Sequence, residues 1–181
     1  KACELYPFQN YYAYAAANLA LDLGSPENAE IYLKKGGKFS NYGDSYYFYL
    51  GRLKALTGGD FNEAFLRASE LAPTFPYIYL EWGAALYNSS DYGGSALKLE
   101  KYLELVPRMW EWKSDLDSKT FEEHERYRIF YKLNPDFNDV FVYLARDYFK
   151  LGDTEEALYY LQFADDNEDS RSTYDVIYKG E

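Results

Sequence analysis

A repeat of about 34 residues runs along this chain and limits its fold more than any single motif does. Proline or polar residues mark the segment ends: Pro7, Asn41, Pro73, Pro107, Pro135 and Asp169. The spacings between these ends are 34, 32, 34, 28 and 34 residues. Proline ends a helix because it lacks the backbone N–H and restricts the residue before it. The segment ends therefore predict helical units of nearly constant length.

A second signal divides most of these units into two helices. Turn sequences lie at 23–26, 58–61, 89–92 and 151–154, each after a run that is rich in Tyr or Leu. A small residue follows each turn, at Ala29, Ala64, Ser95 and Ala157. Another lies in the helix before each turn, at Ala17, Gly51, Gly83 and Ala145. We expect the small residues to let the two helices of a unit approach closely, while larger residues fill the space between units.

These features together resemble the tetratricopeptide repeat (TPR) family, whose units have about 34 residues and two helices. The segment 136–169 matches the family pattern at Phe141, Leu144, Ala145, Tyr148, Gly152, Ala157, Leu161 and Ala164. The resemblance extends along nearly the whole chain. It implies an all-α fold, a right-handed superhelix of antiparallel helix pairs that forms a TPR-like α-solenoid.

The repeat signals divide the chain into seven ranges. Four are predicted to be TPR-like repeats: 8–41, 42–73, 74–107 and 136–169. The range 108–135 is six residues short of the period, and we interpret it as a degenerate repeat with its second helix at 121–133. We interpret 1–7 as the end of a preceding repeat, and 170–181 as a C-terminal cap or the start of a further repeat. We therefore expect the chain to be a fragment of a larger protein.

The charge balance argues against two classes of partner. The chain has 30 acidic and 19 basic side chains, and its net charge is −11. Because affinity for phosphates comes from Lys and Arg, nucleic acids and anionic membrane surfaces are not expected partners. No apolar run approaches the roughly 18 residues of a membrane span, so direct membrane insertion is not expected either.

Catalytic and metal-binding chemistry has little support in the sequence. One cysteine (Cys3) and one histidine (His124) cannot build a disulfide framework or a Cys/His zinc site. Paired carboxylates such as Glu155 and Glu156 occur at polar turns and helix ends, whereas general acid–base catalysis needs a pocket that excludes water. The glycine pairs lack the Lys and Ser/Thr of a phosphate-binding loop. We predict a protein that is not an enzyme and that uses no metal or cofactor.

The TPR resemblance implies that the first helix of each unit lines a concave groove that binds peptides or protein segments. The family's groove positions correspond here to Tyr11, Tyr14, Asn18, Phe48, Arg52, Tyr77, Leu80, Tyr87, Arg146 and Phe149. The subclass that binds chaperone tails needs a Lys/Asn clamp for a terminal carboxylate. Only Asn18 matches that clamp, because Tyr14 and Ser45 stand where the lysines should be.

Two tryptophans in the degenerate repeat are further candidates for partner contact. Trp110 and Trp112 are two residues apart, so on a helix they point to different faces. They either contact a partner or fill the space that the shortened repeat leaves.

Aromatic side chains beside Arg52 and Arg146 predict the chemistry of the partner. Rigid aromatic residues and arginine are enriched at binding hot spots, and arginine binds carboxylates in a bidentate manner. We therefore expect an apolar or aromatic partner segment that carries an Asp, a Glu or a chain terminus. The alternative is that the tyrosines pack against one another and both arginines pair with local acids.

The function that these observations predict is a non-catalytic scaffold for protein–protein interaction. An alternative is a soluble accessory TPR domain of a larger, membrane-bound bacterial enzyme that acts on glycans. Self-association of the array is a third interpretation.

Overall fold

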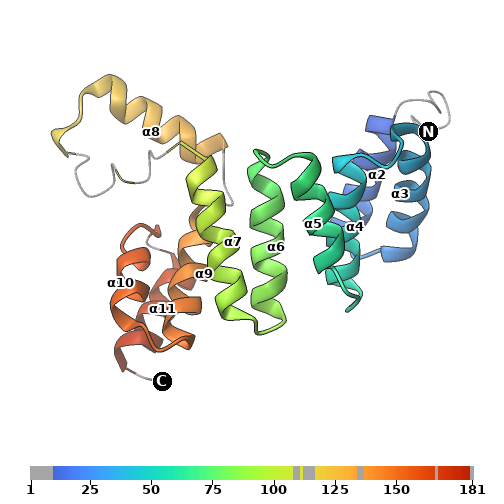
Figure 1. Ribbon diagram of the computed structural model, residues 1–181. Helices are drawn as coiled ribbons and strands as arrows, with labels where there is room; N and C mark the ends of the chain where they lie inside the picture. Colours follow the sequence, from blue (N-terminus) through green and yellow to red (C-terminus); the bar gives the residue numbers. More distant parts are fainter. Residues whose placement is uncertain (1–9, 108–110, 112–116, 134–136, 166, 180–181) are drawn as a thin grey trace. The chain divides into compact units, whose positions relative to one another are not determined.

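The computed structural model describes residues 10–107, 111, 117–133, 137–165 and 167–179. Within these ranges the chain forms ten helices and no strand (Figure 1). The helices are α2 (Asn10–Asp22), α3 (Pro26–Ser40), α4 (Asp44–Leu56), α5 (Asn62–Leu71), α6 (Pro76–Asn88), α7 (Tyr92–Leu105), α8 (Phe121–Leu133), α9 (Phe137–Lys150), α10 (Thr154–Leu161) and α11 (Glu168–Lys179). The all-α prediction is confirmed. None of the described helices is both long enough and apolar enough to cross a bilayer.

The chain divides into two compact units. Unit 1 is Lys1–Ala85 and unit 2 is Leu86–Glu181, so the boundary falls inside α6. The proposed end of a preceding repeat at 1–7 lies outside the described residues, as do Trp110 and Trp112. The limits of the individual repeats stay a prediction.

The turns between paired helices share one backbone feature. Gly24, Gly58 and Gly152 have positive φ angles of 64°, 72° and 87°, and Ser90 takes the same conformation with φ 66°. Each of these residues lies in one of the four predicted turn sequences. Glycine suits this left-handed conformation because it has no Cβ to collide with the backbone. The turn chemistry therefore follows the repeat seen in the sequence.

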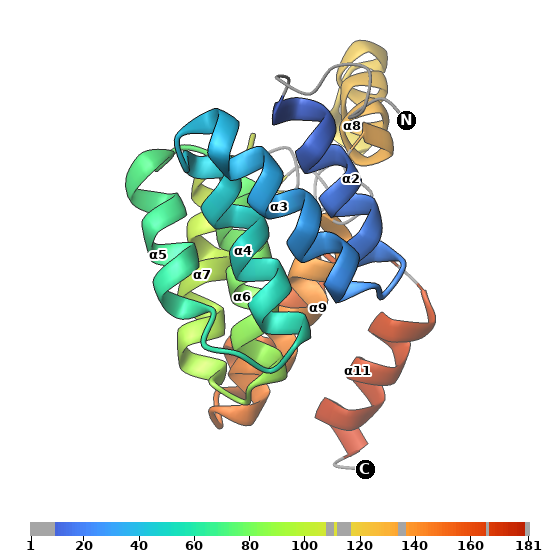
Figure 2. The same cartoon turned by 90° about the vertical axis from the view of Figure 1, so that its right-hand side faces the viewer.

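Unit 1 is built from helices that pack on their neighbours along the chain. α2 packs against α3, α4 packs against α5, and both α2 and α3 contact α4; Figure 2 shows α3 beside α4. Small residues make the close approaches. A Cβ on Gly51 of α4 would lie 2.8 Å from the ring of Phe65 on α5, and one on Gly36 of α3 would lie 2.8 Å from the ring of Tyr14 on α2. These two glycines therefore allow aromatic rings to pack directly on a helix backbone.

An aromatic cluster connects α5 to α6 within unit 1. Phe65 is fully buried and stacks on Trp82, with ring centroids 6.1 Å apart. The Trp82 indole N–H donates to Asn62 Oδ1 at 2.8 Å. The Trp82 ring thus packs on an aromatic neighbour while its N–H has a hydrogen-bond acceptor, as buried tryptophan side chains usually require.

Unit 2 is centred on α9, which packs against α7, α10 and α11. Two aspartates cap α7 and α10 in the same way, because Asp91 accepts from the Gly94 N–H and Asp153 accepts from the Glu156 N–H, each at 3.0 Å. Such caps satisfy N–H groups that the first helical turn leaves without partners.

A carboxylate joins three helices of unit 2. Glu100 of α7 accepts hydrogen bonds from the hydroxyls of Tyr148 on α9 and Tyr160 on α10, the second at 3.2 Å. The two tyrosine rings stack with centroids 5.6 Å apart. Burial, followed by the interactions with Glu100, raises the pKa of both hydroxyls.

The second helix predicted in the degenerate range 108–135 is α8. Thr120 and Glu123 form a reciprocal cap at its start: the Thr120 N–H donates to Glu123 Oε2 at 2.8 Å, and the Glu123 N–H donates to Thr120 Oγ1 at 3.3 Å. Thr followed three residues later by Glu is the usual sequence pattern of such a cap.

Candidate functional site

Arg52 links three of the helices that were predicted to line the groove. Its Nη2 lies 3.2 Å from Asp22 Oδ1 of α2, and its Nε lies 3.1 Å from Glu81 Oε1 of α6. Its Nη1 also donates to the side-chain oxygen of Asn18 on α2. The structure therefore brings Asn18 and Arg52 together. The Arg52 guanidinium is thus already paired with two carboxylates inside unit 1.

The other predicted positions in unit 1 differ widely in exposure. Tyr14 is buried and stacks on Tyr49 with centroids 5.8 Å apart, and Phe48 and Leu80 are buried as well. Tyr77 is partly buried, with its ring 5.8 Å from that of Phe75. Tyr11 alone among these predicted aromatic positions is strongly exposed, at 72%. Among the described residues of unit 1, the predicted groove residues thus contribute more to packing than to exposed surface.

Unit 2 brings the remaining predicted residues together around a pocket of about 200 Å³. Tyr87 comes from the end of α6, and Arg146 and Phe149 come from α9. Residues of α9 and α11 complete the wall: Lys150, Ser172, Thr173, Val176 and Ile177. Two cationic side chains therefore lie beside a mainly aromatic and aliphatic lining.

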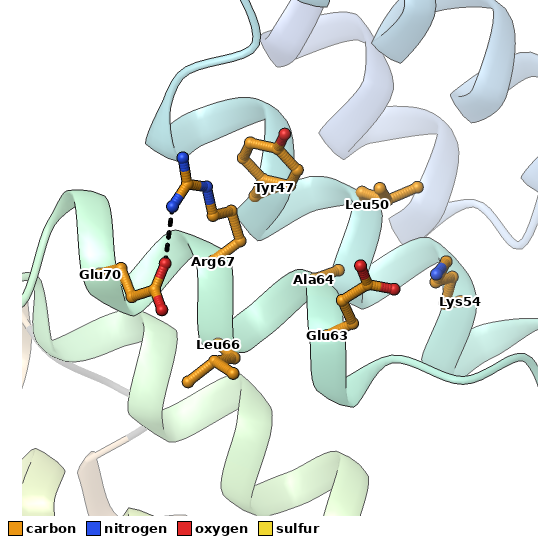
Figure 3. A pocket seen from close by; sticks show the side chains of 8 residues that line it. All are labelled: Tyr47, Leu50, Lys54, Glu63, Ala64, Leu66, Arg67 and Glu70. Carbon is orange, nitrogen blue, oxygen red and sulfur yellow. Dashed lines mark hydrogen bonds and ion pairs between the residues drawn. The ribbon is translucent and has the colours of Figure 1, made fainter.

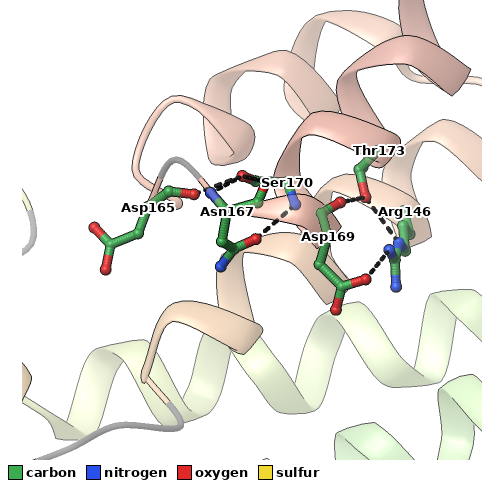
Figure 4. Close-up of polar contacts among 6 residues, drawn as sticks. All are labelled: Arg146, Asp165, Asn167, Asp169, Ser170 and Thr173. Carbon is green, nitrogen blue, oxygen red and sulfur yellow. Dashed lines mark hydrogen bonds and ion pairs between the residues drawn. The ribbon is translucent and has the colours of Figure 1, made fainter.

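Arg146 is held at the edge of this pocket by α11 (Figure 4). Its Nε donates to Thr173 Oγ1 at 2.9 Å, and its Nη2 lies 3.3 Å from Asp169 Oδ1. The Thr173 hydroxyl donates in turn to the backbone oxygen of Asp169 at 2.7 Å. Because the Asp169 side chain is 72% exposed, solvent screens its ion pair with Arg146.

Tyr87 lies beside the same guanidinium. Burial raises the pKa of the Tyr87 hydroxyl, while the charge of Arg146 acts in the opposite direction. The Tyr87 ring also meets the Tyr143 ring edge-on, with centroids 4.9 Å apart. Tyr87 is therefore positioned by α9 on two sides.

A polar cap satisfies backbone N–H groups at the start of α11. The Asn167 N–H donates to Ser170 Oγ at 3.0 Å, and the Ser170 N–H donates to Asn167 Oδ1 at 2.9 Å (Figure 4). Further along the helix, Thr173 and Ile177 are buried. Sequence reasoning did not assign α11 to the groove, although the helical spacing of its apolar residues was the available signal.

Two further pockets lie apart from the predicted positions. One, of about 380 Å³, lies between α4 and α5 and is lined by Tyr47, Leu50, Lys54, Glu63, Ala64, Leu66, Arg67 and Glu70 (Figure 3). Arg67 and Glu70 pair there at 2.7 Å. The other, of about 540 Å³, lies where α10 is followed by α11 and includes Leu161, Arg171 and Tyr174. Acids and bases in the first pocket offset one another, so it favours no one class of charged ligand.

Comparison with solved structures identifies the fold. No protein-family model matches this sequence, and no curated protein matches it. The chain is similar to a crystal structure of MamA, with a TM-score of 0.59 and 16% identity over 98% of this chain and 85% of that chain. A second MamA structure gives a TM-score of 0.57 and 16% identity over 99% of this chain and 80% of that chain. Pseudomonas aeruginosa PilF gives a TM-score of 0.52 and 16% identity over 94% of this chain and 83% of that chain. Because MamA and PilF contain tetratricopeptide repeats, the similarity shows that this chain has a TPR-like α-solenoid fold.

Proposed function

We propose that this chain is a non-catalytic scaffold that binds a segment of a partner protein, and that the pocket around Arg146 and Phe149 is its main anchor. The observation that carries the proposal is the convergence of three predicted groove residues, Tyr87, Arg146 and Phe149, on one pocket. Its volume of about 200 Å³ is below the roughly 300–1,000 Å³ of pockets that enclose whole small molecules. It suits one large side chain of a longer ligand.

The lining of the pocket supports an apolar or aromatic anchor residue. Phe149 and Tyr87 offer aromatic surfaces, and Val176 and Ile177 offer aliphatic ones. Aromatic and aliphatic anchors in such pockets supply most of the affinity of many interfaces, because they remove large apolar areas from water.

The basic residues at the pocket support a carboxylate next to that anchor. Lys150 is exposed, and the bond between Arg146 and Asp169 is a screened surface pair of a kind that contributes about 0–1 kcal/mol. A carboxylate of the partner can therefore replace Asp169 at small cost. Arg52 is less suited to this role, since Asp22 and Glu81 both hold it.

A selection from a displayed peptide library tests the proposal, because such a library samples many candidate partner segments at once. We expect the wild-type chain to enrich peptides with a large apolar residue within a few positions of Asp, Glu or the C-terminus. Phe149→Ala and Lys150→Glu should each lose these peptides. Phe121→Ala is the matched control, because Phe121 is 82% exposed on α8 and does not line the pocket.

Two outcomes would contradict the proposal. One is that the wild-type chain enriches no peptide above the bare support. The other is that selected peptides bind folded Phe149→Ala as tightly as they bind wild type. Isothermal titration calorimetry of individual peptides, with circular dichroism of each variant, separates loss of binding from loss of folding.

A further inference from the structure

Asp147 is a buried acid that the proposed interaction function does not use. It lies on α9 between Arg146 and Phe149, yet its exposed fraction is 0%. Neither carboxylate oxygen has a hydrogen-bond partner among the described residues. An acid in this state is unusual, because most buried polar side chains are hydrogen-bonded.

The surroundings of Asp147 belong to the packing of α9 on α7. Ser95, in the first turn of α7, is also fully buried and lies close enough to influence the titration of Asp147. Its Oγ nevertheless makes no hydrogen bond of normal geometry within the described chain. The Asp91 side chain at the start of α7 is occupied by the Gly94 N–H. We call the contact between α7 and α9 around Ser95 and Asp147 the seam. It contains a carboxyl group that lies close to polar atoms but forms no hydrogen bond with them.

Within the described part of the chain, no positively charged group offsets a negative charge on Asp147. Asp91, which caps α7, repels a negative charge on Asp147, and Tyr87 of α6 is a titratable group that Asp147 influences. Among the described residues of α10 and α11, which also pack on α9, no charged group acts on its titration. Burial is the largest cause, Asp91 adds to it and Ser95 opposes it, and together they raise the pKa of Asp147 to about 7.

We propose that Asp147 is a proton-controlled switch for the packing of α9 against α7. The neutral acid fits the closed seam, whereas loss of its proton to solvent leaves a buried charge with no counter-ion among the described residues. Ionisation therefore favours opening of the seam to water, since an isolated charge in an apolar interior is far costlier than a hydrated one. This switch goes beyond the interaction function. Only one consequence rests on that function: opening would also displace Arg146 and Phe149, which α9 carries into the pocket.

Hydrogen exchange of the full chain tests the switch without any ligand. Wild type and Asp147→Asn are compared at the same pH, so that the intrinsic dependence of exchange on pH cancels. With a pKa of about 7 in the closed seam and about 3.9 when solvated, the opening constant of wild type relative to Asp147→Asn should rise roughly 30-fold between about pH 5.5 and about pH 8. The rise should appear in amides of α9 and of the first turns of α7. Amides of α4 and α5 in unit 1 should not show it.

The control variant is Asp139→Asn, because Asp139 is exposed on the same helix. Its ratio to wild type should be the same at both pH values. A second measurement, NMR titration of the Asp147 carboxyl carbon in wild type, does not require the variant to fold. A carboxyl that is ionised at about pH 5.5, or a ratio that does not change with pH, would overturn the proposal. Neither result depends on peptide binding, so the switch and the interaction function fail separately.

Discussion

Replacing Gly51 with alanine tests the close approach of α4 and α5. The new Cβ would lie 2.8 Å from two atoms of the Phe65 ring, closer than carbon atoms can approach without a shift. Phe65 is fully buried, and its ring is bounded by the rings of Phe48, Phe61 and Trp82. Overpacking of this kind costs about 1–3 kcal/mol, and the higher helix propensity of alanine returns about 0.5–1 kcal/mol. Because the surrounding rings leave Phe65 little room to move, the overpacking cost should lie in the upper part of that range, at about 2–3 kcal/mol, and we expect a net loss of about 1–2.5 kcal/mol in the free energy of unfolding.

Urea unfolding followed by far-UV circular dichroism measures this change. Gly93→Ala is the matched control, because a Cβ added to that helical glycine would have no heavy atom within 4 Å apart from its chain neighbours and the backbone of its own helix. The control should gain about 0.5–1 kcal/mol from helix propensity alone. The reasoning is refuted if Gly51→Ala is as stable as wild type, or if the two variants change stability by the same amount.

Two further predictions concern unit 2. Ala157 is fully buried on α10, so Ala157→Asp should lower the free energy of unfolding by at least about 3 kcal/mol; an unchanged thermal midpoint would show that the repeat register assigned to this helix is wrong. Because burial and Glu100 raise the pKa of the Tyr148 and Tyr160 hydroxyls in the folded state, their contribution to stability is complete below the pKa of an unfolded tyrosine, about 10, and is lost as the pH rises above it. Tyr148→Phe should make that alkaline loss of stability less steep. Urea unfolding measured across this pH range checks the prediction, and a loss as steep as that of wild type would contradict the assignment.

Local features of the chain were predictable from the sequence because they depend on near neighbours. The turns at 23–26, 58–61, 89–92 and 151–154 were visible as glycine and polar residues, and each contains one residue with positive φ. The helix at 121–133 was predicted with the bounds that the structure gives. Backbone preferences, proline stops and glycine turns act over a few residues, so one sequence is enough to recognise them.

The candidate site was predictable only in part. The pattern of positions indicated Tyr87, Arg146 and Phe149, which the structure brings to one pocket. It did not indicate Thr173 or Val176 of α11, because the same spacing fitted either a cap or the start of another repeat. Tyr14, Phe48 and Leu80 were assigned to the groove by position, but how much surface such residues expose depends on the helices that cover them.

Periodicity and turn chemistry are local properties, so they are enough to predict an array of paired helices with small residues at the close approaches. Which acids meet Arg52, what α11 covers and whether Asp147 is buried all depend on how distant helices pack, and only the fold shows them. In the sequence, Asp147 is one polar residue among others on a helix. Its burial arises because α7, more than 40 residues earlier in the chain, packs over it, and contacts between segments so far apart depend on how whole helices pack together.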